Sequence, residues 1–267
     1  MFDRAVRERK KFWGGLEFHP FIERFGSLLS DMGFSPAGFD EAAGFRWRKP
    51  AFEGYEFEIG AAPDGLPPPR GHFRIRVPLV VTSARQTEVN NRLNLWECAN
   101  LNPRNRVRPC AEPTWVIHTP LEWLLAVWEP KLGDFAHTFN RWKCMSTVES
   151  ARWAEDVFHC VQSHATPYFA LIDTPEKLAR RLQDLPAFPG RVGPGGPGSI
   201  DATVFSAVLW NDLGQPTKAL EQLDVDRRWT EARVARGEKD ELFLNIRLCE
   251  IGRMRDWISG CANIASG

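Results

Sequence analysis

The stretch 45–81, FRWRKPAFEGYEFEIGAAPDGLPPPRGHFRIRVPLVV, decides the fold of this chain. Three runs within it, 45–49, 55–59 and 73–77, alternate apolar and charged residues. A period of two is typical of strands that bury one face. If the runs pair as a meander, Glu56 and Glu58 of the second run face the arginines of the first and third runs, and each such pair contributes roughly 0.2 to 1 kcal/mol. We therefore interpret the charged face as internally paired and expect any binding surface elsewhere.

The flanking segments predict an α+β fold. Apolar residues spaced by three and four over 20–32 predict a helix before the strands, and PTWVIHT (113–119) predicts a fourth strand after them. Thr119 and Glu122, with Pro120 between them, form a capping-box pattern that opens another helix. From Ser146 the pattern is helical almost to the end of the chain.

We thus expect an antiparallel sheet of four or more strands in the N-terminal half, packed against helices, and a helical C-terminal half. The two parts are 1–145, which carries the sheet, and 146–267, which packs on it to give one continuous globular unit. A flexible Pro/Gly loop is expected at 186–199 within the second part.

Charge and cysteine content limit the classes of function. Basic and acidic residues number 34 each, so no net field attracts nucleic acid or an anionic membrane. The N-terminal segment is charged where a secretory signal needs an apolar run, and no stretch is apolar enough to span a membrane. The six cysteines are irregularly spaced, so we expect reduced, mostly structural thiols in a cytoplasmic protein.

One predicted helix, 147–164, carries candidate catalytic residues. Glu155 and His159 stand four residues apart, so the carboxylate could orient the imidazole as a general base. The alternative interpretation is an acid and histidine pair on a helix surface, which is the commoner case. Cys160 and His164 share a helix face too, but two ligands do not make a metal site, and we expect no metal.

A glycine-rich segment, GPGGPG (193–198), satisfies a dinucleotide-binding pattern. It lies between predicted helices and not after a strand, and its prolines cannot donate backbone N–H groups to a phosphate. We interpret it as a linker and expect no cofactor.

Tryptophan and arginine supply the candidate binding residues. Most of the eleven tryptophans must lie in the core, because so much exposed aromatic area would promote aggregation. A minority could anchor a partner, and Trp128, Trp142 and Trp153 lie in or beside the irregular segments after the sheet. Arg104 and Arg106 could add an anion-contacting patch, with an ordinary solvated surface as the alternative. The aromatic residues needed to stack on nucleic acid are absent from this loop.

Several short sequence motifs occur in a particular order along the chain. A leading helix ends in MGF, alternating strands FRWRK, YEFEIGAAP and HFRIRVPL follow, and then come ATPYFALIDTPEKLARRL and a helical hairpin that opens with LWNDLG. Over about 20–224 this order resembles the uncharacterised DUF4304-type bacterial domains, apart from a long insert at about 83–115. The resemblance implies no assigned activity or catalytic residues. Some such domains are associated with bacterial toxins as immunity proteins.

Two functional hypotheses follow from these patterns. The first is a non-enzymatic cytosolic protein-binding domain, most concretely a bacterial immunity-type protein that neutralises a toxin or effector. Its partner is another protein, and neither nucleic acid nor a membrane is expected. The alternative is a hydrolase or transferase with a His-based active site, which requires a pocket lined by His159 and Glu155. A regulatory scaffold that uses the helical hairpin is a third interpretation.

Overall fold

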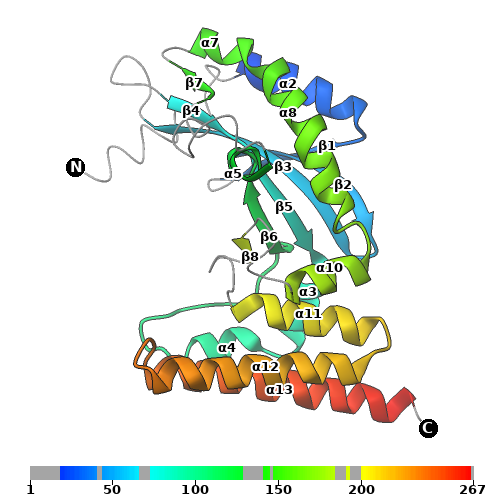
Figure 1. Ribbon diagram of the computed structural model, residues 1–267, viewed down its shortest axis with the longest axis vertical. Helices are drawn as coiled ribbons and strands as arrows, with labels where there is room; N and C mark the ends of the chain where they lie inside the picture. Colours follow the sequence, from blue (N-terminus) through cyan, green and yellow to red (C-terminus); the bar gives the residue numbers. More distant parts are fainter. Residues whose placement is uncertain are drawn as a thin grey trace. The chain divides into compact units, whose positions relative to one another are not determined.

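The structure is a computed structural model that describes residues 19–40, 44–65, 73–128, 141–144, 147–183, 191–192 and 200–265. Its class is α+β, as the sequence predicts, with an antiparallel sheet in the N-terminal half and helices in the C-terminal part (Figure 1). The chain forms two compact units. Unit 1 comprises Met1–Ala51, Glu56–Val81 and Ile117–Leu171, and unit 2 comprises Phe52–Tyr55, Thr82–Val116 and Ile172–Gly267.

The helices and strands have the following bounds. The first part of the chain contains α2 (His19–Asp31), β1 (Ser35–Asp40), β2 (Gly44–Phe52), β3 (Tyr55–Gly65), β4 (Phe73–Arg76), β5 (Pro78–Ser83), α3 (Ala84–Arg92), α4 (Leu95–Ala99), β6 (Thr114–Pro120), α5 (Leu121–Trp128) and β7 (Lys143–Cys144). The second part contains α7 (Thr147–Arg152), α8 (Ala154–Cys160), the π-helical turn η3 (Val161–Ala165), α9 (Thr166–Ala170), α10 (Pro175–Gln183), β8 (Arg191–Val192), α11 (Ile200–Asp212), α12 (Pro216–Ala235) and α13 (Glu241–Ala265).

The predicted first helix is confirmed as α2. Phe21, Phe25 and Leu29 are fully buried and lie four residues apart, so they form one face of the helix. Gly33 ends the helix with a φ of +83°, its N–H donates to the carbonyl of Ser30 at 2.9 Å, and the next N–H reaches back to Leu29 at 3.1 Å. Glycine adopts this left-handed conformation without steric cost, which explains why the helix stops here.

Strands β1, β2, β3, β5 and β6 are hydrogen-bonded in that order, and β4 pairs with both β3 and β7. The three alternating runs are therefore strands that pair as predicted, β2 with β3 and β3 with β4. The sequence did not predict β1, which pairs antiparallel with β2 from Ser35 opposite Arg48 to Asp40 opposite Gly44. Its sequence, SPAGFD, lacks the alternation that marks the other strands.

The charged face of the sheet is internally paired, but with a different register from the one expected. Glu58 is fully buried and accepts a hydrogen bond from Arg48 Nε at 2.7 Å, and Arg46 Nη1 lies 3.8 Å from the same carboxylate. The prediction that the third run also faces the acidic row is wrong, because β4 pairs with residues 62–65 at the far end of β3. Arg74 therefore donates to Asp64, from Nε at 2.9 Å and from Nη2 at 2.6 Å.

The apolar face of the strands packs against helices of unit 1. Phe57 of β3 stacks on Phe169 of α9 with 4.3 Å between ring centroids. Trp47 of β2 meets Phe25 of α2 edge-on at 5.4 Å. Figure 1 shows α2 and α8 side by side in this unit. Aromatic pairs of this geometry contribute about 0.5 to 1.5 kcal/mol each beyond the area that they bury.

Gly26→Ala is expected to destabilise unit 1 by about 1 to 2 kcal/mol, because an added methyl group would press on the buried ring of Trp47. A Cβ at this position would lie 2.9 Å from Trp47 Nε1 and 3.2 Å from Trp47 Cε2. Gly252→Ala in α13 is the matched control, because a Cβ there meets nothing within 4 Å. This control should stabilise the protein by about 0.5 to 1 kcal/mol through helix propensity. Urea denaturation of both variants measures the two effects, and equal shifts would contradict the packing argument.

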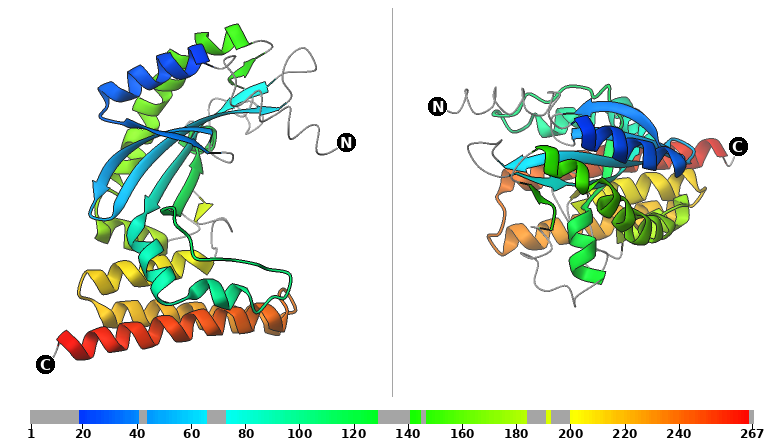
Figure 2. Two further views of the ribbon diagram at one scale, coloured as in Figure 1. Left: turned by 180° about the vertical axis from the view of Figure 1, so that it is seen from behind. Right: turned by 90° about the horizontal axis from the view of Figure 1, so that it is seen from above.

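Helices α11, α12 and α13 of unit 2 lie side by side (Figures 1 and 2). Gly214, with a φ of +70°, turns the chain from α11 into α12, and the N–H of Gln215 donates to the carbonyl of Trp210 at 2.8 Å. This is the helix, glycine turn, helix hairpin that the sequence predicts. Gly237, with a φ of +72°, turns the chain again before α13 begins.

A buried ion pair connects α12 with α13. Arg247 is 1% exposed and Asp226 is 3% exposed, and the guanidinium donates from Nη2 to the Asp226 carboxylate. Arg247 Nη1 donates to Glu250 one turn later on α13. Charges this deeply buried are rare unless they are paired, so the two helices depend on each other at this point.

Candidate binding surface

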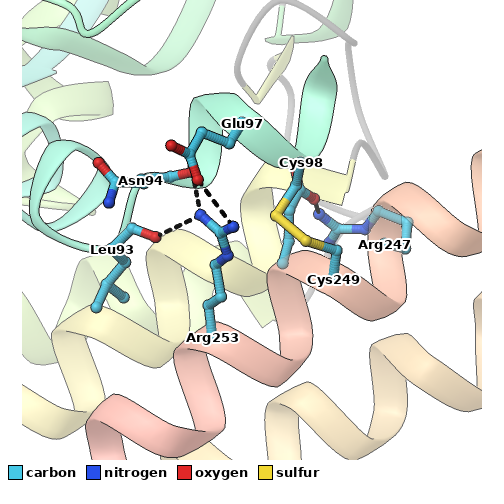
Figure 3. The surroundings of a disulfide bond; sticks show 8 residues. Leu93, Asn94, Glu97, Cys98, Arg247, Cys249 and Arg253 are labelled. Carbon is cyan, nitrogen blue, oxygen red and sulfur yellow. Dashed lines mark hydrogen bonds and ion pairs between the residues drawn. A yellow bond between two sulfur atoms is a disulfide. The ribbon is translucent and has the colours of Figure 1, made fainter. Parts of the chain in front are cut away.

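The turn between α3 and α4 is fixed to α13 by one arginine (Figure 3). Asn94 makes this turn in the left-handed conformation with a φ of 51°, which asparagine tolerates better than most residues. Arg253 of α13 donates to the carbonyl of Leu93 at 3.0 Å and to that of Asn94 at 2.6 Å. It also donates to the carboxylate of Glu97 at 2.9 Å. A single side chain thereby holds the turn through two backbone carbonyls and one carboxylate.

A disulfide bond joins α4 to α13 beside this arginine (Figure 3). It links Cys98, which is fully buried, to Cys249, and the two Cα atoms are 5.8 Å apart. The prediction that all six cysteines are reduced is wrong at these two positions. They are 151 residues apart in the sequence, and only the packing of α4 on α13 brings them together. The other four cysteines form no disulfide: Cys110, which is exposed, Cys144 and Cys160, which are buried, and Cys261, which is half-buried.

We expect four of the six cysteines to react with an alkylating reagent when the protein is denatured without reductant, and six after reduction. Intact-mass spectrometry counts the added groups. In the variant Cys98→Ser all the remaining cysteines should react without reductant, because Cys249 has lost its partner. Alkylation of six cysteines in the unreduced wild-type protein would contradict the bond.

The segment that follows α4, residues 100–113, is held in place by two asparagine side chains. Asn100 Nδ2 donates to the carbonyl of Val107 at 2.9 Å, and its Oδ1 accepts from the Val107 N–H at 2.8 Å. Asn91 of α3 bonds to Cys110 in the same way: its Nδ2 donates to the Cys110 carbonyl at 2.7 Å, and its Oδ1 accepts from the Cys110 N–H at 3.1 Å. In each case an amide replaces the paired backbone that a strand would provide. The loop thus has a defined backbone although it contains no helix or strand.

This fixed loop presents arginine and apolar side chains to solvent. Leu101 is 50% exposed and Val107 is 42% exposed, and both belong to the small group of large apolar residues that lie exposed in the described parts of the chain. Arg104, Arg106 and Arg108 are exposed as well. We call these five residues the basic loop surface. Its composition resembles that of a protein interface more than that of an average polar loop.

A cavity of about 490 Å³ adjoins the loop at Asn102. Its other walls come from the turn between α12 and α13 and from the start of α13. Leu242, Phe243 and Ile246 are its apolar lining residues, and the Lys239 ammonium lies 5.2 Å from the centroid of the Phe243 ring. Glu238, Lys239 and Asp240 also line the cavity, so its surface is part apolar and part charged.

The predicted tryptophan anchors lie elsewhere. Trp142 is 1% exposed and donates from Nε1 to Asp156 at 2.6 Å, so it lies in the core. Trp153 is half-buried beside α8. The side chain of Trp128 lies outside the described part of the molecule. Arg104 and Arg106 of the predicted binding residues lie exposed on the same loop.

The predicted catalytic pair lies on α8 of unit 1. The Glu155 carboxylate accepts from Arg24 of α2 at 2.6 Å, and both of these side chains are largely exposed. Asp156, the other acid near His159, accepts from Arg141 at 3.0 and 3.2 Å, and Arg141 and Trp142 hold its pKa below the usual range, against the effect of burial. Neither Glu155 nor His159 lines any cavity described here. The two acids thus have basic partners of their own.

Metal and membrane sites can be assessed over the ranges that the structure covers. His164 Nδ1 lies 3.1 Å from the backbone carbonyl of Cys160, and no group of three or more His, Cys, Asp or Glu residues among the described positions could hold a metal ion. None of the helices in these ranges is long and apolar enough to cross a membrane. The GPGGPG segment at 193–198 lies outside them.

Comparison of the chain with family models, with curated proteins and with solved structures finds no match.

Sequence reasoning found the arginines of the loop but missed the residues that hold it. The signal for them is the density of asparagine in NNRLNLWECANLNPRN, residues 90–105. Asparagine amides bond readily to nearby backbone groups in turns, so such a run predicts a structured loop. Arg253 and Cys249 left no such signal, because they reach the loop only through the tertiary packing of α13.

Proposed function

We propose that this protein binds another protein through the basic loop surface. The observation that supports the proposal is a loop with a fixed backbone that exposes three arginines and two large apolar side chains. Arginine is enriched among the residues that dominate binding energy at interfaces. A loop that is already ordered loses little conformational entropy when it binds, so more of the contact energy is available for affinity.

The chemistry of the loop points to a partner with an acidic patch and an apolar side chain. Arg104 and Arg108 make no side-chain hydrogen bond or ion pair with the residues that the structure describes, so their guanidinium groups can form bidentate bonds with carboxylates of a partner. The neighbouring cavity above Phe243 receives the apolar side chain. Interfaces commonly combine such a filled pocket with a charged rim.

We further propose, from the sequence resemblance, that the partner is a bacterial toxin or effector domain and that this protein neutralises it in the cytoplasm. Masking an active surface requires a stable interface of about 1,600 Å² and no chemistry of its own. The proposal agrees with the placement of Glu155 and His159 away from the described cavities.

The test is co-expression of this protein with the product of the neighbouring gene, followed by co-purification and a binding titration. The double variant Arg104→Glu, Arg108→Glu should weaken binding at least about tenfold, because it places like charges opposite an acidic patch. The control is Arg227→Glu, Arg228→Glu, an equal charge change at exposed positions of α12. Binding that both double variants leave unchanged would overturn the proposed surface. Loop-dependent binding to RNA in place of protein would overturn the proposed class of partner.

A further inference from the structure

A second cavity, of about 730 Å³, lies within unit 2, and residues 52–55 form one of its walls. Gly54 brings this wall close to α3. It has a φ of +73°, its carbonyl accepts from the Ala84 N–H at 3.0 Å, and a Cβ on it would lie only 3.1 Å from Arg85 Cβ. Only glycine combines this positive φ with this close approach to Arg85 without strain. The position of residues 52–55 against α3 therefore depends on Gly54.

The cavity is acidic although an arginine, Arg85, is one of its lining residues. Arg85 donates to both oxygens of Asp212, at 2.9 and 2.8 Å, and to Glu88 at 2.9 Å. Two carboxylates therefore already compensate its charge. Glu53 also lines the cavity and makes no ion pair with the residues described. Three carboxylates and one guanidinium leave a net charge of −2 on the lining.

The other walls are aromatic and aliphatic. Phe52 and Tyr55 both line the cavity, and their ring centroids are 4.5 Å apart. Leu209 and Leu213 of the α11 end and Pro175 of α10 complete the apolar part. Aromatic faces attract cations, and aliphatic walls cover the stem that carries one.

A buried acceptor without a donor lies next to this wall. Gln86 is fully buried, and its Nε2 donates to the Tyr55 hydroxyl at 2.9 Å and to the Phe205 carbonyl at 3.2 Å. These two bonds fix the orientation of the amide. Its Oε1 is buried and has no hydrogen-bond partner among the residues described. Gln86 does not itself line the cavity, but its bond to the Tyr55 hydroxyl fixes the position of a ring that does.

We propose that this cavity binds a cationic group on a short apolar stem, an alkylammonium or a guanidinium, and that Glu53 and Glu88 are its charge partners. The group comes from a free amine or from a lysine or arginine side chain of a partner. Glu88 is the carboxylate that exchanges, because it is more exposed than Asp212 and holds Arg85 by one bond against two. This site is separate from the basic loop surface, and the proposal does not depend on the function proposed for that surface.

Isothermal titration calorimetry of the full chain with four probes tests the proposal. N-acetyl-arginine amide and N-acetyl-lysine amide represent a partner's side chains, agmatine represents a free amine, and N-acetyl-citrulline amide is the neutral isostere. Cationic probes should bind with a Kd of about 10 mM or below, and the neutral isostere at least about tenfold more weakly. Glu53→Gln and Glu88→Gln should each weaken binding by about three- to tenfold. Glu176→Gln on α10, an equal charge change outside the lining, should leave binding unchanged.

The probes also distinguish the two proposed sources of the cationic group, a partner's side chain and a free amine. Tighter binding of the blocked amino acids supports a partner's side chain, and tighter binding of agmatine supports a free amine. Absence of binding by all cationic probes, or equal binding of the citrulline probe, would overturn the proposal. Cation binding that survives both Glu53→Gln and Glu88→Gln would overturn the assigned site.

Discussion

Replacing Asp226 by asparagine is expected to lower the free energy of unfolding of unit 2 by about 3 to 5 kcal/mol, because it leaves the buried charge of Arg247 without its main partner. Both side chains are almost completely buried between α12 and α13. Glu250, a further partner of Arg247, is 17% exposed and lies on α13 itself, so it does not replace a carboxylate on α12. Urea denaturation followed by circular dichroism measures the loss.

Two further variants separate the cost of an unpaired charge from the loss of packing. Asp224→Asn is the matched control, since Asp224 pairs with Arg255 between the same two helices but both side chains are substantially exposed. We expect it to cost about 0 to 1 kcal/mol. In the double variant Asp226→Leu, Arg247→Met no buried charge remains, so much of the lost stability should return. A double variant less stable than Asp226→Asn would contradict the argument.

Glu122→Gln is expected to stabilise unit 1 at pH 8 by about 3 kcal/mol and to have little effect at pH 4. Burial raises the pKa of the Glu122 carboxyl from 4.5 to about 7, and the charges of Arg76 and Arg74 offset only part of this. Oε1 accepts from the Val77 N–H at 3.4 Å, a long hydrogen bond, and Oε2 has no partner among the described residues. The native protein therefore disfavours the ionised carboxylate.

The sign of the pH dependence follows from the raised pKa. Below pH 4.5 the carboxyl is protonated in both the native and the unfolded chain, so it contributes no pH dependence. Between pH 4.5 and about 7 the unfolded chain ionises first, and the native state loses stability as the pH rises. Above about pH 7 the full penalty is present. Glutamine carries no titrating group, so the variant should lack this decline.

Denaturation midpoints of the wild type and Glu122→Gln, measured from pH 4 to 8, provide the test. Glu112→Gln is the control, because it makes the same substitution at an exposed position. Parallel curves for wild type and Glu122→Gln over this range would contradict the assignment of a raised pKa.

Local patterns predicted the secondary structure well where one chain segment determined the outcome. The alternation in 45–49, 55–59 and 73–77 became strands, and Gly33 and Gly214 end helices as their positions indicated. The capping-box pattern correctly placed the start of a helix, since α5 begins at Leu121, but its two side chains bond to distant partners. The Thr119 hydroxyl bonds to that of Tyr168 at 2.7 Å, and Glu122 turns to the backbone of Val77. Both partners are distant in sequence.

Among the candidate sites too, the sequence indicated the residues of a single segment but not those that tertiary packing brings together. Arg104 and Arg106 could be recognised from the loop itself, since an exposed polar segment needs no partner to be identified. The disulfide, the contact of Arg253 with the α3–α4 turn and the cavity around Arg85 each combine segments more than 100 residues apart. The spacing of residues in the sequence cannot identify such pairs, because these contacts depend on how the helices pack against each other and not on the periodicity within each helix.

The interleaving of the two units also sets an order for folding on the ribosome. Unit 1 has all its segments once Leu171 has been synthesised, whereas unit 2 still lacks every residue from Ile172 onward. Its early segments, α3, α4 and the basic loop surface, emerge long before Cys249 and Arg253, the residues that anchor them. Since domains fold as their segments become available, we expect the loop at residues 100–113 to reach its final form only after α13 has been synthesised. A truncated nascent chain would thus carry the arginines without the architecture that presents them.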